Sequence, residues 1–477
     1  MEKVKFFGLF IFCILSLKAV AGSDEVCNDL HRLTCAPGSY DDGTGTATNT
    51  SYLSNKSSDI QKKMIEKSKI EFSKILLDPD NVYFRKSVLS ATGLSESPQC
   101  QAADKKPNAE CLNLMADATA DILANQQFNP YEQMNREKYS SRSISDTTYV
   151  TDSPLFKKVQ DGLTADLRGS LNEVATNKKI QNTIFPQVKS MILAKIDLMV
   201  TDPALRDSLK DKIKVIQYVG SDCSKDYGGE NSIPGILVSN AFYNPAQNTF
   251  KYCLGMGVQN TSEYQLAFVI AHELSHSIDP CGITRGPSDF AFKYKSNLDR
   301  AKAEQEFPFN GVIVCLRSDK SVHAIFQGQV QQNGYGGAQV AQSNIPVNKD
   351  PLFCQNDQIT ESFADWMAAE ILPDYMEKNH PQLTVQQKRI GYSNIWRGMC
   401  QSAASSAAIA GMNTSLDPHP AQEARANDII LMQPKIRSQM GCPPTLQDRV
   451  YCSINNTIAS TCKECSVQPN SQQRGAR

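Results

Sequence analysis

Apolar residues in the N-terminal half recur every three or four positions, which is the period of a helix. The first such run extends from Ser58 to Leu77 and stops at Asp78-Pro79, because the residue before a proline avoids helical geometry. Pro203 begins a later run at the first helical position, where its missing N–H costs nothing. Besides the first run, the pattern predicts helices at about 155–177, 180–201 and 203–216. We therefore expect a helical N-terminal region.

The pattern of apolar residues changes near residue 235. From Gly235 to Tyr252 short apolar runs are interrupted by Asn and Pro, which favours strands and turns. Within this region, Val238 to Pro245 predicts an edge strand. Farther on, an i,i+4 stripe predicts a helix with one buried face, at Leu266, Ile270, Leu274 and Ile278. The expected fold is α+β and mainly helical, with a small mixed sheet beside this helix.

Shifts in composition divide the chain into expected segments. Residues 36–58 are rich in Gly, Ser, Thr, Asn and Asp, which bury too little apolar surface to order a core, so a flexible connector is expected after Cys27 and Cys35. The last residues of the chain are also polar. The expected segments are a signal peptide (1–21), a cysteine-containing segment with its linker (22–58), a helical region (59–214), a domain around the helix of the apolar stripe (215–442) and a cysteine-containing tail (443–477).

The first residues have the pattern of a secretory signal peptide. Lys3 and Lys5 precede an apolar run from Phe6 to Leu17, and small residues at 19–21 suit cleavage. No later stretch contains the roughly 20 continuous apolar residues that a membrane-spanning helix needs. The formal net charge of −1 argues against nucleic acid or an anionic membrane as the main partner, because both require a basic excess. We expect a secreted or periplasmic protein without an integral membrane segment in the mature chain.

The fifteen cysteines indicate disulfide bonds. One leaves with the signal peptide, and the remaining fourteen permit seven disulfides in an oxidising compartment. The sequence leaves their pairing open, although Cys100 and Cys111 could close a short loop. The Cys-x-x-Cys at 462–465 could bind structural zinc together with Cys442 and Cys452. In an exported chain, structural disulfides are the expected alternative.

The candidate chemistry lies on the helix of the apolar stripe. His272, Glu273 and His276 form His-Glu-x-x-His, which puts two imidazoles one helical turn apart with a carboxylate between them. This spacing is a signature of zinc hydrolases, in which the two histidines bind Zn²⁺ and the glutamate acts as a base. A third protein ligand must come from elsewhere, so that the fourth position stays open for water.

Further acidic residues are candidates for the same centre. Glu361 and Asp365 have i,i+4 spacing on a helix predicted to end at Leu372, before Pro373. Glu361 is the expected third ligand, while Asp365 could accept a hydrogen bond from the ring N–H of a ligand histidine. Asp279 could do the same for the other imidazole. Alone, such an acidic pair more often forms a solvated helix face, but the upstream motif favours metal binding.

Two other segments carry candidate site residues. His419 directly precedes a predicted helix that begins with proline, a position suited to a hydrogen-bond donor for an oxyanion; an incidental surface histidine is the alternative. Arg425, two turns into that helix, is expected to bind substrate or to support His419. Asn240 and Ala241 lie on the predicted edge strand, which could pair with an extended peptide. A strand without a substrate role is the alternative there.

With these motifs in this order, residues 238–428 resemble the gluzincin zinc peptidases, which combine His-Glu-x-x-His with Glu-x-x-x-Asp. Similarity to the neprilysin and endothelin-converting enzyme family lies in His-Ser-Ile-Asp at 276–279, Asn-Ala-Phe-Tyr-Asn-Pro at 240–245, and Asp417-x-His419 followed by Arg425. The resemblance implies a zincin-type catalytic domain at 215–442.

A second branch of the same peptidases is equally similar. The CAAX prenyl protease and heat-shock membrane protease family is suggested by Val269 to Leu274, Phe363 to Asp365, and His419-Pro420 with Arg425. The chain departs from both branches in three features: it lacks predicted transmembrane helices, it has extra cysteines between its two motifs, and it is shorter than neprilysin-type ectodomains. The branch, the substrate size and the shape of the cleft therefore stay open.

The expected function is that of a zinc-dependent metalloendopeptidase with one Zn²⁺ per chain and a peptide or protein substrate. His272, His276 and Glu361 are the expected ligands. Glu273 is the expected base, and His419 the expected donor to the oxyanion. One alternative is a non-catalytic, disulfide-stabilised binding or envelope protein that retains a zinc site, although such a site needs no base between its ligands. Another is a cell-wall amidase or endopeptidase, which shares the chemistry.

Overall fold

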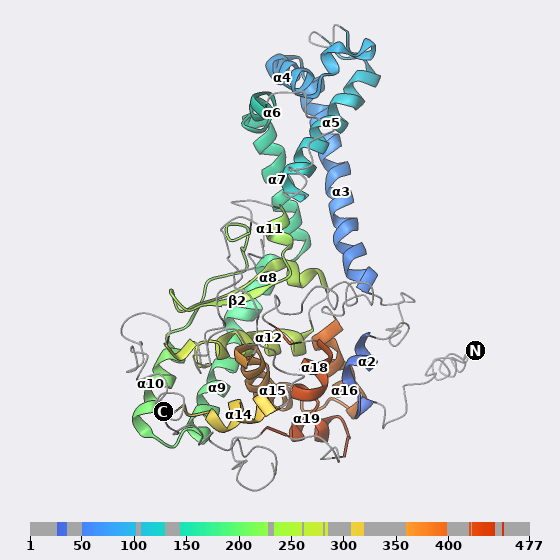
Figure 1. Cartoon of the computed structure of the whole chain (residues 1–477). Helices are drawn as coiled ribbons and strands as arrows, with labels where there is room; N and C mark the ends of the chain where they lie inside the picture. The colour runs from blue at the N-terminus through green and yellow to red at the C-terminus, as the bar shows by residue number, and fades with distance from the viewer. Residues whose placement is uncertain are drawn as a thin grey trace, which may run out of the picture.

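The computed structural model describes residues 26–35, 50–101, 106–128, 144–227, 233–259, 262–279, 282–284, 307–318, 359–397, 419–420, 422–443 and 451–452. Over these ranges the protein is mainly helical and contains a three-stranded mixed sheet, as the sequence predicts. Figure 1 shows an arm of long helices that stands on a larger body. No described helix is both long and apolar enough to cross a membrane.

The arm is built from helices that pack their apolar stripes against one another. They are α3 (Thr50–Leu77), α4 (Val82–Thr92), α5 (Ala109–Phe128), α6 (Ile144–Thr151) and α7 (Pro154–Ser170), with 3-10 turns at Pro79–Asn81, Leu94–Glu96 and Pro98–Cys100. Phe72 of α3 and Phe156 of α7 stack with their ring centroids 5.4 Å apart. A disulfide joins Cys100 to Cys111 and closes the expected short loop.

Helix α3 corrects one expectation from composition. The connector expected at 36–58 is wrong in its second part, because α3 already begins at Thr50. Once packing holds the buried part of a helix, each residue added at its end gains a backbone hydrogen bond without a new nucleation cost. The polar flank therefore joins the helix. Residues 36–49 lie outside the described residues.

The helix predicted at 155–177 is interrupted in the structure. Helix α7 ends at Ser170, and α8 (Glu173–Lys179) begins a new turn toward the body. Asn172 between them has a φ of 52°. Asparagine tolerates this left-handed conformation, which a continuous right-handed helix excludes. Periodicity alone does not detect such a break, since apolar residues on both sides keep helical spacing.

The body consists of shorter helices around two central ones. Its elements are α2 (Leu30–Cys35), a π-helical turn (Ile180–Ile184), α9 (Phe185–Met199), α10 (Pro203–Lys214), α11 (Ile233–Leu237), a 3-10 turn (Leu254–Gln259), α12 (Glu263–Ser275), a 3-10 turn (Gly282–Thr284), α14 (Asn310–Ser318), α15 (Ile359–Asn379), α16 (Val385–Arg397), α18 (Gln422–Ala424), a π-helical turn (Arg425–Ile430) and α19 (Pro434–Gln439). In Figure 1, α12 and α15 lie between α9 and α10 on one side and α16 and α18 on the other.

The sheet has the order β1-β3-β2, with β1 (Gln217–Tyr218) parallel and β2 (Ala241–Asn244) antiparallel to β3 (Thr249–Tyr252). Strand β2 is therefore an edge strand inside the predicted region, and it packs against α12. In register, Phe242 pairs with Lys251 and Tyr243 with Phe250. The small mixed sheet lies beside α12, as expected.

Helix α15 is longer than the sequence predicts. The expected end at Leu372 is wrong, because α15 continues through Pro373 to Asn379. Leu372 and Tyr375 are fully buried on the two sides of the proline, and Gln439 donates a hydrogen bond to the Pro373 carbonyl at 3.0 Å. Burial of this face outweighs the cost of about 3 kcal/mol that proline brings to a helix interior.

Buried apolar residues form two separate cores. The core of the arm includes Leu163 and Leu167 and reaches Ile233 and Leu254 at the junction with the body. The core of the body surrounds α12 and α15 and also contains the buried residues from Ile180 to Ile216. Along the chain, the change from the core of the arm to the core of the body thus falls between Leu167 and Ile180. The sequence placed the boundary between the helical region and the following domain at residue 214. Helices α9 and α10 bury their apolar faces against the body.

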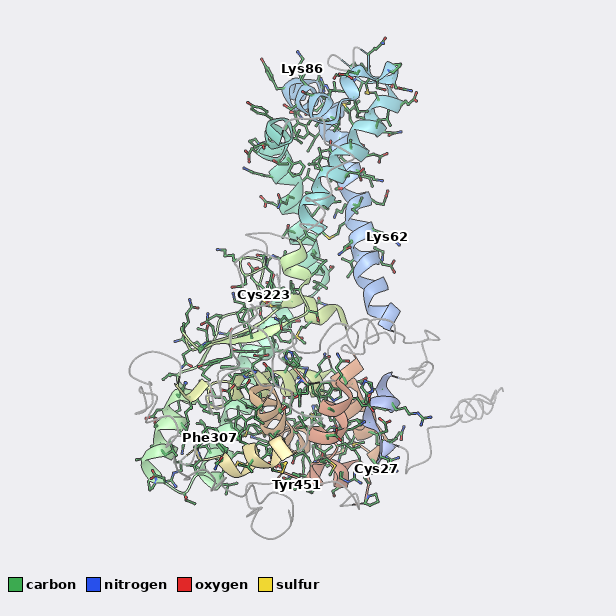
Figure 2. All side chains as sticks on the ribbon, viewed as in Figure 1. Cys27, Lys62, Lys86, Cys223, Phe307 and Tyr451 are labelled. Atoms are coloured by element: carbon green, nitrogen blue, oxygen red, sulfur yellow. A yellow bond between two sulfur atoms is a disulfide. The ribbon has the colours of Figure 1, made fainter. Side chains whose placement is uncertain are left out.

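Disulfides tie distant parts of the described chain together. Besides the loop in the arm, they are Cys27–Cys442, Cys223–Cys253 and Cys315–Cys452. Cys27 lies near the base of the body and Cys223 near the junction with the arm (Figure 2). Because Cys442 and Cys452 are consumed in disulfides, the zinc cluster that combined them with 462–465 is wrong; residues 462–465 and 1–21 lie outside the described part.

Candidate metal centre

Helix α12 places the motif in the middle of the body. Ser262 caps its start by accepting the Gln265 N–H at 3.2 Å. The predicted apolar stripe is buried, at Leu266, Ile270, Leu274 and Ile278. The helix ends at Ser275, and His276 follows as its C-cap, still with helical dihedral angles. The two motif histidines therefore remain one turn apart.

Helix α15 packs against α12 and brings two carboxylates to His272. Asp365 Oδ1 lies 2.8 Å from Nδ1 of His272, and Glu361 Oε2 lies 3.1 Å from its Nε2. The Asp365 side chain is fully buried and that of Glu361 is only 14% exposed. The acidic pair is thus not a solvated helix face. Ala364 and Ala368 on the same helix are also fully buried, as expected for close approach.

Three candidate ligand atoms converge between these helices. His272 Nε2 lies 3.2 Å from His276 Nε2, and Glu361 Oε2 lies 3.1 Å from the first nitrogen and 3.4 Å from the second. Ligands bound at about 2.0–2.1 Å to a tetrahedral zinc ion are about 3.3–3.4 Å apart. The triangle therefore has the dimensions of three corners of a zinc tetrahedron.

Each motif histidine has its own carboxylate partner at Nδ1. Asp365 Oδ1 faces His272, and Asp279 Oδ2 faces Nδ1 of His276 at 2.8 Å. We assign the Nδ1–H tautomer to both neutral rings, since a carboxylate accepts only from a donor. Both Nε2 atoms then turn a lone pair toward each other and toward Glu361 Oε2. Such an arrangement is satisfied by a shared cation and fits the donor set that zinc takes.

Asp365 is held in turn by Arg425. The guanidinium donates from Nε to Oδ2 at 2.6 Å and from Nη2 to Oδ1 at 2.9 Å, and its Cζ lies 4.9 Å from the centre of the Trp396 ring. Arg425 is only 6% exposed. From the sequence, Arg425 was expected to bind substrate or to support His419. In the structure its guanidinium instead forms a bidentate pair with the buried Asp365 carboxylate.

The electrostatics of the centre favour positive charge. Burial opposes the charged form of His272, but the charge of Asp365 and its hydrogen bond raise the pKa to about 9. Burial also opposes the charged form of His276, yet the charge of Glu361 raises its pKa well above the usual value. Burial favours protonated Glu361, whereas the charges of His276 and His419 hold its pKa well below the usual range. The buried carboxylates of the centre therefore stabilise positive charge at the two histidines.

Glu273 lies beside the triangle and has a different partner. Its Oε2 accepts the backbone N–H of Tyr243 on the edge strand β2 at 3.0 Å. Burial raises the pKa of Glu273, which the positive charges of His272 and His276 partly offset. The carboxylate is therefore held at the strand edge and has proton affinity above that of an ordinary glutamate.

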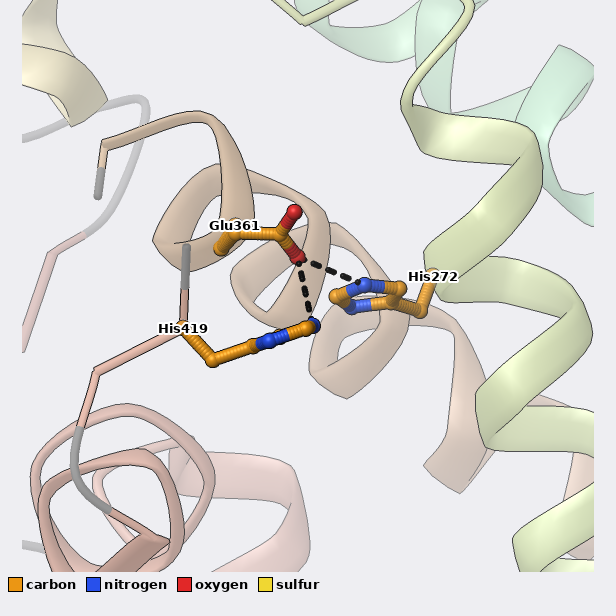
Figure 3. A group of neighbouring side chains, drawn as sticks. All are labelled: His272, Glu361 and His419. Atoms are coloured by element: carbon orange, nitrogen blue, oxygen red, sulfur yellow. Dashed lines mark hydrogen bonds and ion pairs between the residues drawn. The ribbon is translucent and has the colours of Figure 1, made fainter. Parts of the chain in front are cut away.

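His419 approaches Glu361 from the side opposite α12. Its Nε2 lies 3.2 Å from Glu361 Oε2, and its side chain is 39% exposed. Figure 3 shows Glu361 between His272 and His419. These three residues also form a group of candidate ligand atoms within 4.8 Å of one another. That group is looser than the triangle with His276, whose edges are 3.4 Å or shorter.

The residues expected at the substrate strand lie on β2 or directly before it. Asn240 donates from its amide to the Tyr227 hydroxyl at 2.7 Å and accepts the Ala241 N–H at 2.9 Å. Ala241 is two residues before Tyr243, which touches Glu273. The structure thus brings the edge strand to the motif, while the Asn240 side chain is engaged within its own segment.

Two contributors were not singled out from the sequence. Tyr243 donates its backbone N–H to Glu273. Every residue except proline has a backbone N–H, so the residue type gives no indication of this contact. Lys212 is 2% exposed and lies on the buried face of α10, three positions after the buried Leu209 and four before Ile216, which is buried just beyond the helix. A charged residue at an apolar position of a periodic stripe was a detectable signal.

A scan against protein-family models finds no match to this chain, and a search of curated proteins finds none either.

Proposed function

We propose that this protein is a zinc-dependent metallopeptidase with a zincin-type catalytic domain of the gluzincin kind. The observation that carries the proposal is the triangle of His272 Nε2, His276 Nε2 and Glu361 Oε2, with edges of 3.1–3.4 Å. Glu273, the motif residue between the histidines, is bonded to a strand edge. A site with three ligands and a separate, partly buried carboxylate suits hydrolysis.

The chain's residues have distinct roles in this proposal. His272, His276 and Glu361 hold the ion. Bound zinc would supply Lewis-acid chemistry, which acidifies water and polarises a carbonyl. Glu273 takes a proton from the attacking water at its carboxylate and passes it to the leaving amine nitrogen, a transfer that its raised pKa favours. His419 donates from its ring N–H to the developing oxyanion.

Strand β2 is the proposed substrate platform. It is one of the two edge strands of the described sheet, and the Tyr243 N–H points away from β3 toward Glu273. An extended peptide adding to this edge would run past the metal centre, with Ala241 as a backbone partner. The substrate class is therefore a peptide or protein in extended conformation.

Export of the protein is part of the proposal. The described disulfides, among them Cys27–Cys442 across nearly the whole chain, are typical of proteins in oxidising compartments. A secreted or periplasmic location with a cleaved signal at 1–21 accounts for them.

The decisive experiment compares two substitutions on α12 for zinc content and hydrolysis of a diverse peptide library. Glu273→Gln should keep about one zinc per chain and lose nearly all hydrolysis, because it removes the proton acceptor only. His272→Ala should lose both. Glu263→Gln, the same change at the first residue of the helix, is the matched control and should keep both. Full hydrolysis by Glu273→Gln would contradict the proposed role.

The same library separates the two alternatives. A non-catalytic zinc protein would give no chelator-sensitive cleavage in the wild-type protein. An amidase of cell-wall cross-links would cleave cross-linked peptide fragments added to the library and leave ordinary peptides intact. The position of β2 beside Glu273 favours the peptidase, since strand pairing recognises ordinary peptide backbone.

A further inference from the structure

The turn after the motif helix holds the partner of His276. Asp279 uses Oδ2 for His276 Nδ1, at 2.8 Å, and Oδ1 to accept the Gly282 N–H. Its own carbonyl accepts the Ile283 N–H at 3.0 Å. The orientation of the Asp279 carboxylate, and with it the orientation of the His276 ring, therefore depends on where this turn lies.

Glycine at position 282 permits an unusually close approach. A Cβ atom at Gly282 would lie 1.6 Å from the carbonyl oxygen of His276, so any side chain there would displace the turn or the end of α12. The turn thus lies directly on the backbone of a ligand residue. A small movement of the turn would be transmitted to His276.

A buried lysine on α10 fixes this turn from the other side. Lys212 is 2% exposed, and its Nζ donates to the Gly282 carbonyl. Its own carbonyl accepts the Asn248 amide at 3.2 Å, and Asn248 accepts the Tyr243 hydroxyl at 2.7 Å. Lys212 is therefore connected both to the turn after the motif and to the strand that touches Glu273.

The charge of Lys212 also matches the centre. Burial lowers its pKa to about 8, while the negative charge of Asp279 opposes that shift. The ammonium is therefore largely protonated at neutral pH. It faces the carboxylate that orients His276, in a region where charges are weakly screened.

We propose that Lys212 is a positioning residue for the metal centre: by holding Gly282 it keeps Asp279 on His276 Nδ1 and so sets the affinity for zinc. The proposal rests on the metal centre of the proposed function. It assigns a role to a lysine about 70 positions before its contact on the turn.

The test measures zinc affinity by competition with a chelator, for the full mature chain. Lys212→Met should weaken zinc binding about 10-fold, within the range typical of partners of metal ligands. Lys189→Met is the matched control, because Lys189 also donates to backbone carbonyls, those of Lys214 and Ile216, but has no contact with the turn. It should lower stability and leave the zinc affinity within about twofold.

Coupling between residues distinguishes positioning from general destabilisation. In an Asp279→Asn background, Lys212→Met should cost less than about twofold in zinc affinity, because its route to His276 is already cut. In an Asp365→Asn background, which affects His272 instead, the full loss of about 10-fold should persist. Equal losses in both backgrounds would overturn the proposal, as would unchanged affinity of the single variant.

Two further outcomes are informative. If Lys212→Met does not fold, the same cycle is run with Lys212→Gln, whose shorter neutral donor should weaken zinc binding about threefold and show the same coupling. If the wild-type chain binds no zinc, the proposed function fails; if it binds zinc and the Lys212 variants bind it equally well, only this inference fails.

Discussion

At the scale of single residues, the two motif histidines sit in different environments. His272 is bonded to Asp365, which is fully buried and neutralised by the bidentate Arg425. His276 is bonded to Asp279, which is held by a turn and faces Lys212. Each motif histidine thus has a carboxylate partner, and each of these carboxylates has a cation nearby. In the neutral rings, this arrangement favours the tautomer that carries its proton on Nδ1 and leaves Nε2 free.

His419 is expected to act only in the transition state. Replacing it by Phe should lower kcat about 10²–10³-fold, the effect of losing one oxyanion donor, while KM and zinc content stay nearly unchanged. Single-turnover kinetics combined with metal analysis checks this. His380→Phe, at a partly exposed histidine bonded to Glu263, is the control. Zinc loss in His419→Phe would make His419 a ligand, and a rate within about threefold of wild type would leave it without a catalytic role.

Lys212 should give the protein a distinctive dependence of stability on pH. Its folded pKa of about 8 lies below the ordinary value of 10.5, so between these values the unfolded chain binds more protons. The free energy of unfolding therefore rises as the pH increases from about 8 to about 10.5. As the pH falls back through 8, this pH-dependent gain in stability is lost. The free energy of unfolding of wild type relative to Lys212→Met should increase by about 2 kcal/mol from pH 7 to about pH 9.5.

Chemical denaturation at the two pH values measures this difference. Subtracting the variant removes the titration of groups that both proteins share. A difference that stays flat between pH 7 and about pH 9.5 would mean that Lys212 keeps an ordinary pKa in the folded protein.

At the scale of elements, the candidate metal centre depends on how closely α15 approaches α12. Glu361 and Asp365 reach His272 across this contact. Ala368 follows Asp365 by three positions on the same face and is fully buried. Small residues at such positions keep the helices close enough for the carboxylates to meet the histidines. Helix spacing and side-chain size therefore set the geometry of the site.

Ala368→Leu should disturb both packing and metal binding. The added side chain overfills the contact and should cost about 1–3 kcal/mol of stability, and it should weaken zinc binding by moving Glu361. Thermal unfolding and chelator competition measure the two effects. Lys378→Leu, at an exposed position of the same helix, should change neither by much. Unaltered zinc affinity in a destabilised Ala368→Leu would show that the centre tolerates separation of the helices.

At the scale of the whole molecule, the arm and the body have separate cores. The disulfide Cys100–Cys111 lies in the arm, whereas Cys27–Cys442 joins the N-terminal segment to the end of the body across 415 positions. Arg437 strengthens the second connection by donating to the Cys27 carbonyl at 2.9 Å. The residues of the candidate metal centre all lie in the body.

Removing each disulfide should therefore have different consequences. The double Ser variant of Cys27 and Cys442 should destabilise the body by about 2–5 kcal/mol. It should lower the midpoint temperature of the unfolding transition that shifts when zinc is removed. The double Ser variant of Cys100 and Cys111 should destabilise the arm and leave zinc affinity unchanged. Calorimetry with and without a chelator checks both. A single transition lowered equally by both variants would show that the two cores unfold as one unit.

Local sequence patterns predicted several of the helices, an edge strand and part of the candidate site. The i,i+4 spacing fixed His272 and His276 on one turn, and the edge strand and the buried stripe of α12 followed from periodicity. The end of α15 at Pro373 was wrong because tertiary burial outweighed a local penalty. The break at Asn172 escaped because it depends on one dihedral angle and not on the period.

The sequence by itself determined which residue types stand at which helical spacing, since backbone geometry relates positions three or four apart in any context. Only the tertiary structure decided that Arg425 belongs to Asp365, that Tyr243 holds Glu273, and that Lys212 holds the turn beside Asp279. These pairs are separated by 60, 30 and 70 positions. Their meeting depends on how α10, α12 and α15 pack into one core, which no local period encodes.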